Sequence, residues 1–427
     1  MKKKINIVLE FIGYFLIYLS CYFHFTKFCA YLIGVSILKN KFFKEKIENK
    51  QIAIVLDRAI GHRDIEIIQE TTNKAPKFLF MKRSITKLIL FYFSNKRKLF
   101  FNYIKPPVCE KDYFKQSLND KQMHENFWSE VIFFIKKKYN NKTLCFVTFN
   151  FTYFAEVALY AGCKKNNIPV KLWHKEGIKT SREAELETKT WGVKFRHVFK
   201  YFDKISVYNE LVKKMFIKID KSNSKKITIN GCPRKKDYLI KKKYHKRIDT
   251  VLFLSFDEKR GIPRLNKNKN LNWASSYYKV IKILNELSKT EDINILIKIK
   301  SNSESQLNNV ILDKRIKIFS DGTAKKYINR ADIIIGHNSA STIEALINGK
   351  YVLVPFFEKN SKLLKYLYNF NRELIFKSEK KMKKKILNLL HKKVVFPLKN
   401  VQHKKTIDYY LGNTKNSTQK YLNFLNS

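Results

Sequence analysis

A strand–helix–strand unit can be traced through residues 332–356, and it constrains the fold more than any other part of the chain. The apolar run 333–335 predicts a parallel strand that is buried on both faces. The stretch 340–347 then predicts a helix closed by Gly349, and residues 351–354 predict a second strand. Parallel strands require such a crossover helix between them, so the unit belongs to a parallel sheet.

Small and polar residues gather at the start of this helix: Gly336, Asn338, Ser339, Ser341 and Thr342. Unpaired N–H groups and the positive end of the helix dipole point there, so the turn suits a phosphate group. Glu344 lies one turn further on, where a carboxylate can reach a ribose hydroxyl. A plain helix cap uses the same residues, with Ser339 or Ser341 as the N-cap and Glu344 as its capping-box partner. Both interpretations stay open.

Strands alternate with helices along most of the chain, in two series. One series runs from the strand 51–56 to the strand 226–229, and the other from the strand 251–255 to the helix 380–390. The lysine-rich stretch 241–247 divides them and is the expected linker. This alternation predicts an α/β protein with two Rossmann-like parallel-sheet domains, and 427 residues are enough for both cores.

Ligands bind beyond the carboxyl ends of the strands in open parallel sheets. Many polar residues of this chain fall at predicted strand ends: Asp57, His62, Arg63, Asp64, His174, Glu176, Arg234, Asp237, Lys298, Asp321, Asn338 and Ser339. Each position alone is a weak indication. Their shared placement favours function at several of them together.

The net charge of +50 is extreme and comes mostly from lysine spread along the whole chain. The sequence has no zinc-knuckle spacing, RNP-like aromatic stretch or heptad-bearing basic helix, so we expect no nucleic acid as the primary partner. An anionic membrane face or an anionic glycan is the better electrostatic partner.

The N-terminal stretch 5–38 is apolar and aromatic, and lysines flank it on both sides. Glu10, His24 and Lys27 interrupt it, which leaves two short pieces rather than one span. We expect residues 1–45 to form a helical segment that contacts the membrane as a shallow hairpin or as interfacial helices. A buried pair of domain helices is the alternative.

The six cysteines are scattered, without a Cys-x-x-Cys pair, as in a protein of the reducing cytoplasm. Together with the N-terminal stretch, they predict a cytoplasmic protein that is peripheral or monotopic at the inner membrane.

The segment 336–345, with Gly349-Lys350 and the strand to Pro355 behind it, resembles the donor-binding segment of GT-B glycosyltransferases. It is most similar to the bacterial surface-carbohydrate and capsule-polysaccharide group, which is related to the CDP-glycerol glycerophosphotransferases. Weaker matches to that group are the turn 172–177, the stretch 231–237, the lysine-containing strand 297–300 and the tail 410–413. The resemblance rests on the order and spacing of these segments along the chain.

This resemblance implies an acceptor domain at 46–245, a nucleotide-donor domain at 246–400, and a C-terminal helix at 401–427 that returns to the first domain. It implies no cofactor and no catalytic metal, and the chain has no Asp-x-Asp motif. Leaving-group charge would then be met by the helix start at 339–342 and by basic side chains, with Arg260, Arg264 and Lys298 as candidates. Asp321 is a further candidate for binding the donor.

A base must take a proton from the acceptor hydroxyl, and the candidates are Glu176, His174, Asp64 and His62. Glu176 is favoured because it lies in a turn at a strand end. On the acceptor side we expect Asp57, Arg63, Arg234 and Asp237. Alternatively, Arg234 and Asp237 form a surface ion pair, and residues 57–64 a solvated loop.

The expected function is transfer of a sugar, or a polyol phosphate, to a surface polysaccharide or lipid-linked glycan at the inner face of the membrane. The donor would be a nucleotide sugar or a CDP-polyol. A nucleotide-sugar 2-epimerase of the same fold and a non-catalytic, membrane-peripheral glycan-binding protein remain as alternatives.

Overall fold

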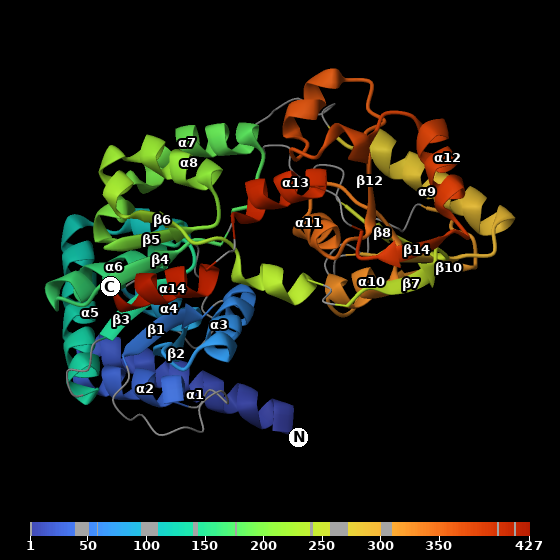
Figure 1. Ribbon diagram of the computed structural model, residues 1–427. Helices are drawn as coiled ribbons and strands as arrows, with labels where there is room; N and C mark the ends of the chain where they lie inside the picture. Colours follow the sequence, from blue (N-terminus) through green and yellow to red (C-terminus); the bar gives the residue numbers. More distant parts are fainter. Residues whose placement is uncertain are drawn as a thin grey trace.

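Two parallel sheets, one in each lobe, organise the molecule (Figure 1). The computed structural model describes residues 2–38, 51–57, 59–94, 110–139, 144–175, 177–239, 242–256, 272–299, 310–398, 401–413 and 416–427. Within these ranges each sheet has six strands, and a two-stranded antiparallel sheet is added to the second lobe. This is the expected fold class: α/β, with two Rossmann-like parallel-sheet domains.

The N-terminal lobe has the strand order β2-β1-β3-β4-β5-β6. Its strands are β1 (Ile52–Asp57), β2 (Lys77–Lys82), β3 (Leu144–Thr148), β4 (Val170–Trp173), β5 (Lys204–Val207) and β6 (Ile227–Ile229). Its helices are α3 (Ala59–Thr71), α4 (Arg83–Ser94), α5 (Leu118–Lys138), α6 (Val157–Lys165), α7 (Ser181–Phe195) and α8 (Glu210–Ile219). The strand order reverses between β1 and β3, which makes this the switch point where ligands bind in such sheets.

The C-terminal lobe has the strand order β10-β9-β8-β11-β12-β13, which is 3-2-1-4-5-6 when its strands are counted from β8. The strands are β8 (Thr250–Leu254), β9 (Asn294–Lys298), β10 (Ile316–Phe319), β11 (Ile333–Ile335), β12 (Tyr351–Pro355) and β13 (Ile375–Phe376). The helices are α9 (Ala274–Thr290), α10 (Ala324–Arg330), α11 (Ala340–Ile347) and α12 (Glu379–Leu389). Here the order reverses between β8 and β11, directly before α11.

The stretch 241–247, expected as a linker, is a linker only in part. Residues Tyr244–Arg247 form β7, which pairs antiparallel with β14 (Lys393–Phe396). Side chains of β7 alternate between half-buried and exposed, and Lys246 Nζ lies 2.8 Å from Oδ2 of the buried Asp332. The period of two and this internal partner explain why a lysine-rich stretch is a strand. Residues Ser361–Tyr366 form a short 3-10 helix, η8.

Two terminal segments pack on the N-terminal lobe. The helices α1 (Lys2–Tyr22) and α2 (Thr26–Leu38) lie against each other and against α4, α5 and β2, at one end of the lobe (Figure 1). Helix α13 (Val401–Leu411) packs against α11, and α14 (Ser417–Asn426) then lies against α3 and β5 of the N-terminal lobe. Tyr421 of α14 stacks on Trp173 at the end of β4, with ring centroids 4.2 Å apart.

Inner-face residues of α1 and α2 belong to the core of the N-terminal lobe, including Ile17, Cys29 and Ile33, each at most 4% exposed. None of the helices in the described part of the chain is long and apolar enough to cross a membrane. Among the described residues, the cysteines at 21, 29, 145, 163 and 232 are buried free thiols.

Candidate functional site

A buried ionic cluster lies at the carboxyl end of the N-terminal sheet, centred on Asp64 of α3. Its carboxylate is fully buried, and Arg234 Nε lies 3.0 Å from Oδ1. The Tyr208 hydroxyl donates to Oδ2 at 2.8 Å, and Lys175 Nζ lies 3.6 Å from the same oxygen. These residues follow β1, β4, β5 and β6, so the parallel sheet itself brings them to one edge.

Lys175 and Tyr208 are members of this cluster that the sequence interpretation missed. Burial lowers the pKa of Lys175 from 10.5 to about 7, although Asp64 partly offsets the shift. Its ammonium also lies 3.8 Å from the centre of the Phe149 ring. Both residues stand next to predicted strand ends, and that position was the available signal.

The start of α11 is open to solvent. Ser339 accepts a hydrogen bond from the backbone N–H of Ser341 at 3.2 Å, which is a cap. Ala340 is exposed, and Ser341 is half-buried. A Cβ on Gly336 would come within 2.5 Å of Thr342 Oγ1, so glycine lets the strand end approach the helix closely. The capping interpretation is therefore correct for Ser339 and leaves room for an anion at the same turn.

A connection between the lobes runs through the 3-10 helix η6 (Pro233–Tyr238), which follows β6 and packs against both α3 and α11. Glu344 of α11 is hydrogen-bonded to Tyr238 and Ser341, and the positive charge of Arg234 lowers the pKa of its carboxyl. Burial raises the pKa of the Glu344 carboxyl above its ordinary value, and these partners partly offset that rise. Arg234 is therefore ion-paired with Asp64 of its own lobe and interacts electrostatically with Glu344 of the other lobe.

Two residues expected to bind the donor instead hold the protein together. The Asn338 side chain donates to the Tyr366 carbonyl at 2.5 Å and accepts from the Tyr368 backbone N–H at 2.8 Å. The Thr342 hydroxyl donates to the His337 carbonyl at 2.8 Å. Both side chains are at most 1% exposed, so they shape the turn at 336–342 from within.

Lys298 and Asp321 lie near each other at the ends of β9 and β10. Lys298 Nζ donates to the carbonyls of Ile299 and Ser320 at 2.6 and 3.1 Å. Burial lowers the pKa of Lys298, and Asp321 raises it again in part. Asp321 also accepts from the Tyr327 hydroxyl at 3.2 Å. The Lys298 ammonium is therefore hydrogen-bonded to backbone carbonyls. Its strand, β9, lies two positions from β11 in the sheet.

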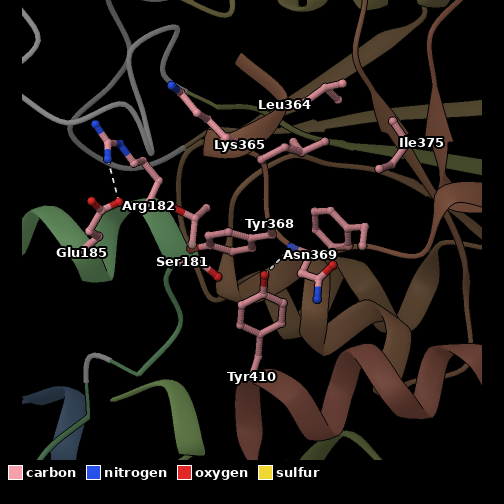
Figure 2. Close-up of a pocket in the computed structure, with 12 residues that line it drawn as sticks. Ser181, Arg182, Glu185, Leu364, Lys365, Tyr368, Asn369, Ile375 and Tyr410 are labelled. Atoms are coloured by element: carbon pink, nitrogen blue, oxygen red, sulfur yellow. Dashed lines mark hydrogen bonds and ion pairs between the residues drawn. The ribbon is translucent and has the colours of Figure 1, made fainter. Parts of the chain in front are cut away.

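A pocket of about 670 Å³ opens between the lobes beside the loop that Asn338 holds. Ser181, Arg182 and Glu185 of α7 line it from the N-terminal lobe, and the stretch 364–370 lines it from the C-terminal lobe (Figure 2). Tyr410 of α13 points into this region, and its hydroxyl accepts from the backbone N–H of Asn369 (Figure 2). The pocket combines aromatic walls with the charged pair Arg182–Glu185.

The base candidates differ in access. His174 and Asp64 are fully buried, so in this structure neither reaches an acceptor hydroxyl, because packing and ion pairs enclose them. His62 is half-buried with its ring 4.6 Å from that of Phe80. Glu176 lies outside the described residues.

Several other predicted site residues are placed only in part. Arg63 is paired with Glu66 and Glu70 on its own helix, at 3.1 and 2.7 Å, rather than with the cluster. The side chains of Asp57 and Asp237 are outside the described part of the structure, and so are Arg260 and Arg264. Among the described residues, no three His, Cys, Asp or Glu side chains are grouped so that they could hold a metal ion.

The arrangement defines the class of protein: a two-lobed α/β protein with a Rossmann-like parallel sheet in each lobe, polar strand ends at the lobe boundary and a pocket between the lobes. A scan of protein-family models and a search of curated proteins both found no match.

Solved structures with a similar fold exist. The UDP-GlcNAc 2-epimerase of Methanocaldococcus jannaschii shares 13% identity over 88% of this chain and 99% of that chain, with a TM-score of 0.48. The Neisseria meningitidis enzyme bound to UDP-GlcNAc shares 11% identity over 88% and 99%, with a TM-score of 0.49. The wall teichoic acid polymerase TagF shares 12% identity over 72% and 94%, with a TM-score of 0.41. At these identities and scores the likeness assigns no activity to this chain.

Proposed function

We propose that the protein is a transferase that moves a sugar or polyol phosphate from a nucleotide-activated donor to a glycan or lipid-linked acceptor. One observation carries the proposal: the open start of α11, at the switch point of the C-terminal sheet, is joined through Glu344 to Arg234 and Tyr238 of the other lobe. Phosphate-suited N–H groups, a carboxylate and a cation therefore meet at one place.

In this proposal the donor diphosphate lies against the N–H groups at 339–342, and Glu344 accepts from a ribose hydroxyl. Arg234 stabilises the negative charge that develops on the leaving diphosphate. The acceptor oxygen, after losing its proton to a base, forms the new bond as the bond to the diphosphate breaks. Glu176 and His62 are the base candidates, because Asp64 and His174 are enclosed.

Calorimetry with CMP, CDP, UDP and GDP tests the donor site. We expect one nucleotide to bind, and we expect the double variant Ser341→Ala/Glu344→Ala to lose at least about tenfold in affinity, since two direct contacts are removed. The matched control is Ser378→Ala/Glu379→Ala, which removes a capping serine and an acidic residue at the start of α12. Failure of every nucleotide to bind, or equal affinity in both variants, would overturn the donor site.

Product analysis distinguishes the related alternatives. A nucleotide sugar that is converted without any acceptor indicates a 2-epimerase, which needs carboxyl groups but no second substrate. Polymer binding without turnover, unchanged by Glu176→Gln and Glu344→Gln, indicates a glycan-binding protein. Turnover that requires an acceptor and falls in Glu176→Gln or His62→Ala supports the transferase and identifies its base.

A further inference from the structure

Five aromatic side chains project into solvent where α1 meets α2. They are Tyr22, Phe23, Phe25, Phe28 and Tyr31, which are between 43% and 63% exposed. We term this group the aromatic corner. Exposed aromatic residues are normal singly, but a group of five on one short stretch marks an interaction surface. Helices α1 and α2, which carry the corner, lie at one end of the N-terminal lobe (Figure 1).

Hydrogen bonds and ring stacking fix the conformation of the aromatic corner. His24 adopts the left-handed conformation, with φ of 54°, and this turns the chain between the helices. Glu130 of α5 accepts from the Thr26 hydroxyl at 3.0 Å and lies 3.3 Å from His24 Nε2. The rings of Phe23 and Phe25 stack at 5.5 Å.

The opposite face of the same helices is packed in the core. Cys21, Cys29 and Ile33 are at most 3% exposed, so the helices cannot rotate to hide the aromatic corner without exposing these residues. The outward direction of the rings is therefore set by the packing of α1 and α2 on α4 and α5.

Lysines lie on and beside the corner, together with the acidic Glu130. Lys27 is exposed between Phe25 and Phe28, and Lys137 is exposed on α5, the helix that packs against α2. Lys138 Nζ lies 5.5 Å from the centre of the Tyr31 ring. A surface with aromatic rings and lysines matches the interface of an anionic bilayer, where rings sit at headgroup level and lysines meet acidic lipids.

We propose that the aromatic corner inserts into the headgroup layer of an anionic lipid bilayer and holds the N-terminal lobe on its surface, without spanning it. Neither α1 nor α2 is long and apolar enough to cross a bilayer, and α2, with 13 residues, extends only about 20 Å against an apolar layer of about 30 Å. A symmetric dimer through the corner is the competing occupant, and sedimentation distinguishes it from a bilayer. The proposal is independent of the donor site.

Flotation of the full-length protein with vesicles tests the surface. Phosphatidylcholine vesicles with and without phosphatidylglycerol are compared for the wild type, for Phe23→Ser/Phe25→Ser, and for the control Val193→Ser/Ile311→Ser. The control replaces two apolar residues that are 86% and 91% exposed elsewhere. We expect the wild type to bind the anionic vesicles. The corner variant should lose about tenfold or more in vesicle affinity, and the control should bind like the wild type.

Two further measurements keep the outcome clear. The variant Lys27→Glu/Lys137→Glu should show a smaller preference for vesicles with phosphatidylglycerol. In the variant Phe25→Trp, brominated lipid should quench the fluorescence of the introduced tryptophan. Circular dichroism checks folding, and nucleotide affinity should be unchanged in the corner variant. The proposal is overturned if the wild type does not float, if the corner variant floats like the control, or if sedimentation shows a dimer that the corner variant dissociates.

Discussion

Arg234 Nε lies 3.0 Å from Asp64 Oδ1, which joins the start of the interlobe helix η6 to helix α3 near the switch point of the N-terminal sheet. Asp64 is fully buried, and only 27% of the Arg234 side chain is exposed. The pair fixes the orientation of η6, which packs on α11, so that Tyr238 bonds to Glu344 and the charge of Arg234 acts on the same carboxyl. The geometry between the lobes therefore depends on an ion pair inside one lobe.

Asp64→Asn should strongly destabilise the protein. Arg234 and Lys175 would lose their buried counter-charge, and breaking such a pair costs about 3 kcal/mol or more of the free energy of unfolding. Urea unfolding followed by circular dichroism measures the change. Glu70→Gln on the same helix is the control, because Glu70 is 60% exposed in its pair with Arg63 and should cost under about 0.5 kcal/mol. Equal effects in both variants would contradict the central role of Asp64.

Lys175 should make stability depend on pH. Its pKa is about 7 in the folded protein and 10.5 ordinarily, so above pH 7 the unfolded chain binds the extra proton. The free energy of unfolding therefore rises with pH from about 7 towards 10.5, and the burial penalty is fully present below pH 7. The difference between the wild type and Lys175→Met isolates this contribution from other titrations. A difference that is flat over this pH range would show that Lys175 stays charged in the fold.

Gly412→Ala should destabilise the connection between α13 and α14, through which the chain returns to the N-terminal lobe. Gly412 has φ of +69°, and a Cβ there would lie 2.0 Å from the Tyr208 carbonyl oxygen. Backbone must move, so we expect a loss of more than about 3 kcal/mol. Gly322→Ala is the matched control, since its φ is +67° but its nearest neighbour is 3.9 Å away, and only the conformational penalty of about 1 kcal/mol remains. Similar melting temperatures for the two variants would refute the close approach.

Asn338→Ala should loosen the wall of the interlobe pocket. The variant loses both hydrogen bonds to the backbone of Tyr366 and Tyr368, worth about 2 kcal/mol together. Hydrogen exchange by mass spectrometry should show faster exchange over residues 363–370. Asn360→Ala, which removes only an exposed cap of η8, should leave these amides slow. Normal exchange combined with lost nucleotide binding would restore Asn338 as a ligand contact.

The sequence was most informative where local patterns decide the structure. The strand 333–335 and the helix 340–347 have the predicted bounds, because an apolar run, a polar turn and a closing glycine act within a few residues. The stretch 241–247 was misjudged because its strand β7 depends on β14 and on Asp332, both distant in sequence. Lys175 and Tyr208 went unnoticed for a similar reason, since their partners Asp64 and Arg234 are distant in sequence.

By itself, the sequence determined the alternation of strands and helices, the α/β class and the turn before α11, because hydrophobic period and glycine placement act locally. Only the tertiary structure decided which polar residues meet. It paired Asp64 with Arg234, placed Glu344 beside Tyr238, and turned Asn338 inward to hold a loop. It also separated the buried face of α1 and α2 from the aromatic face. The physical reason is that burial and ion pairing depend on which elements pack together, and no local pattern records that packing.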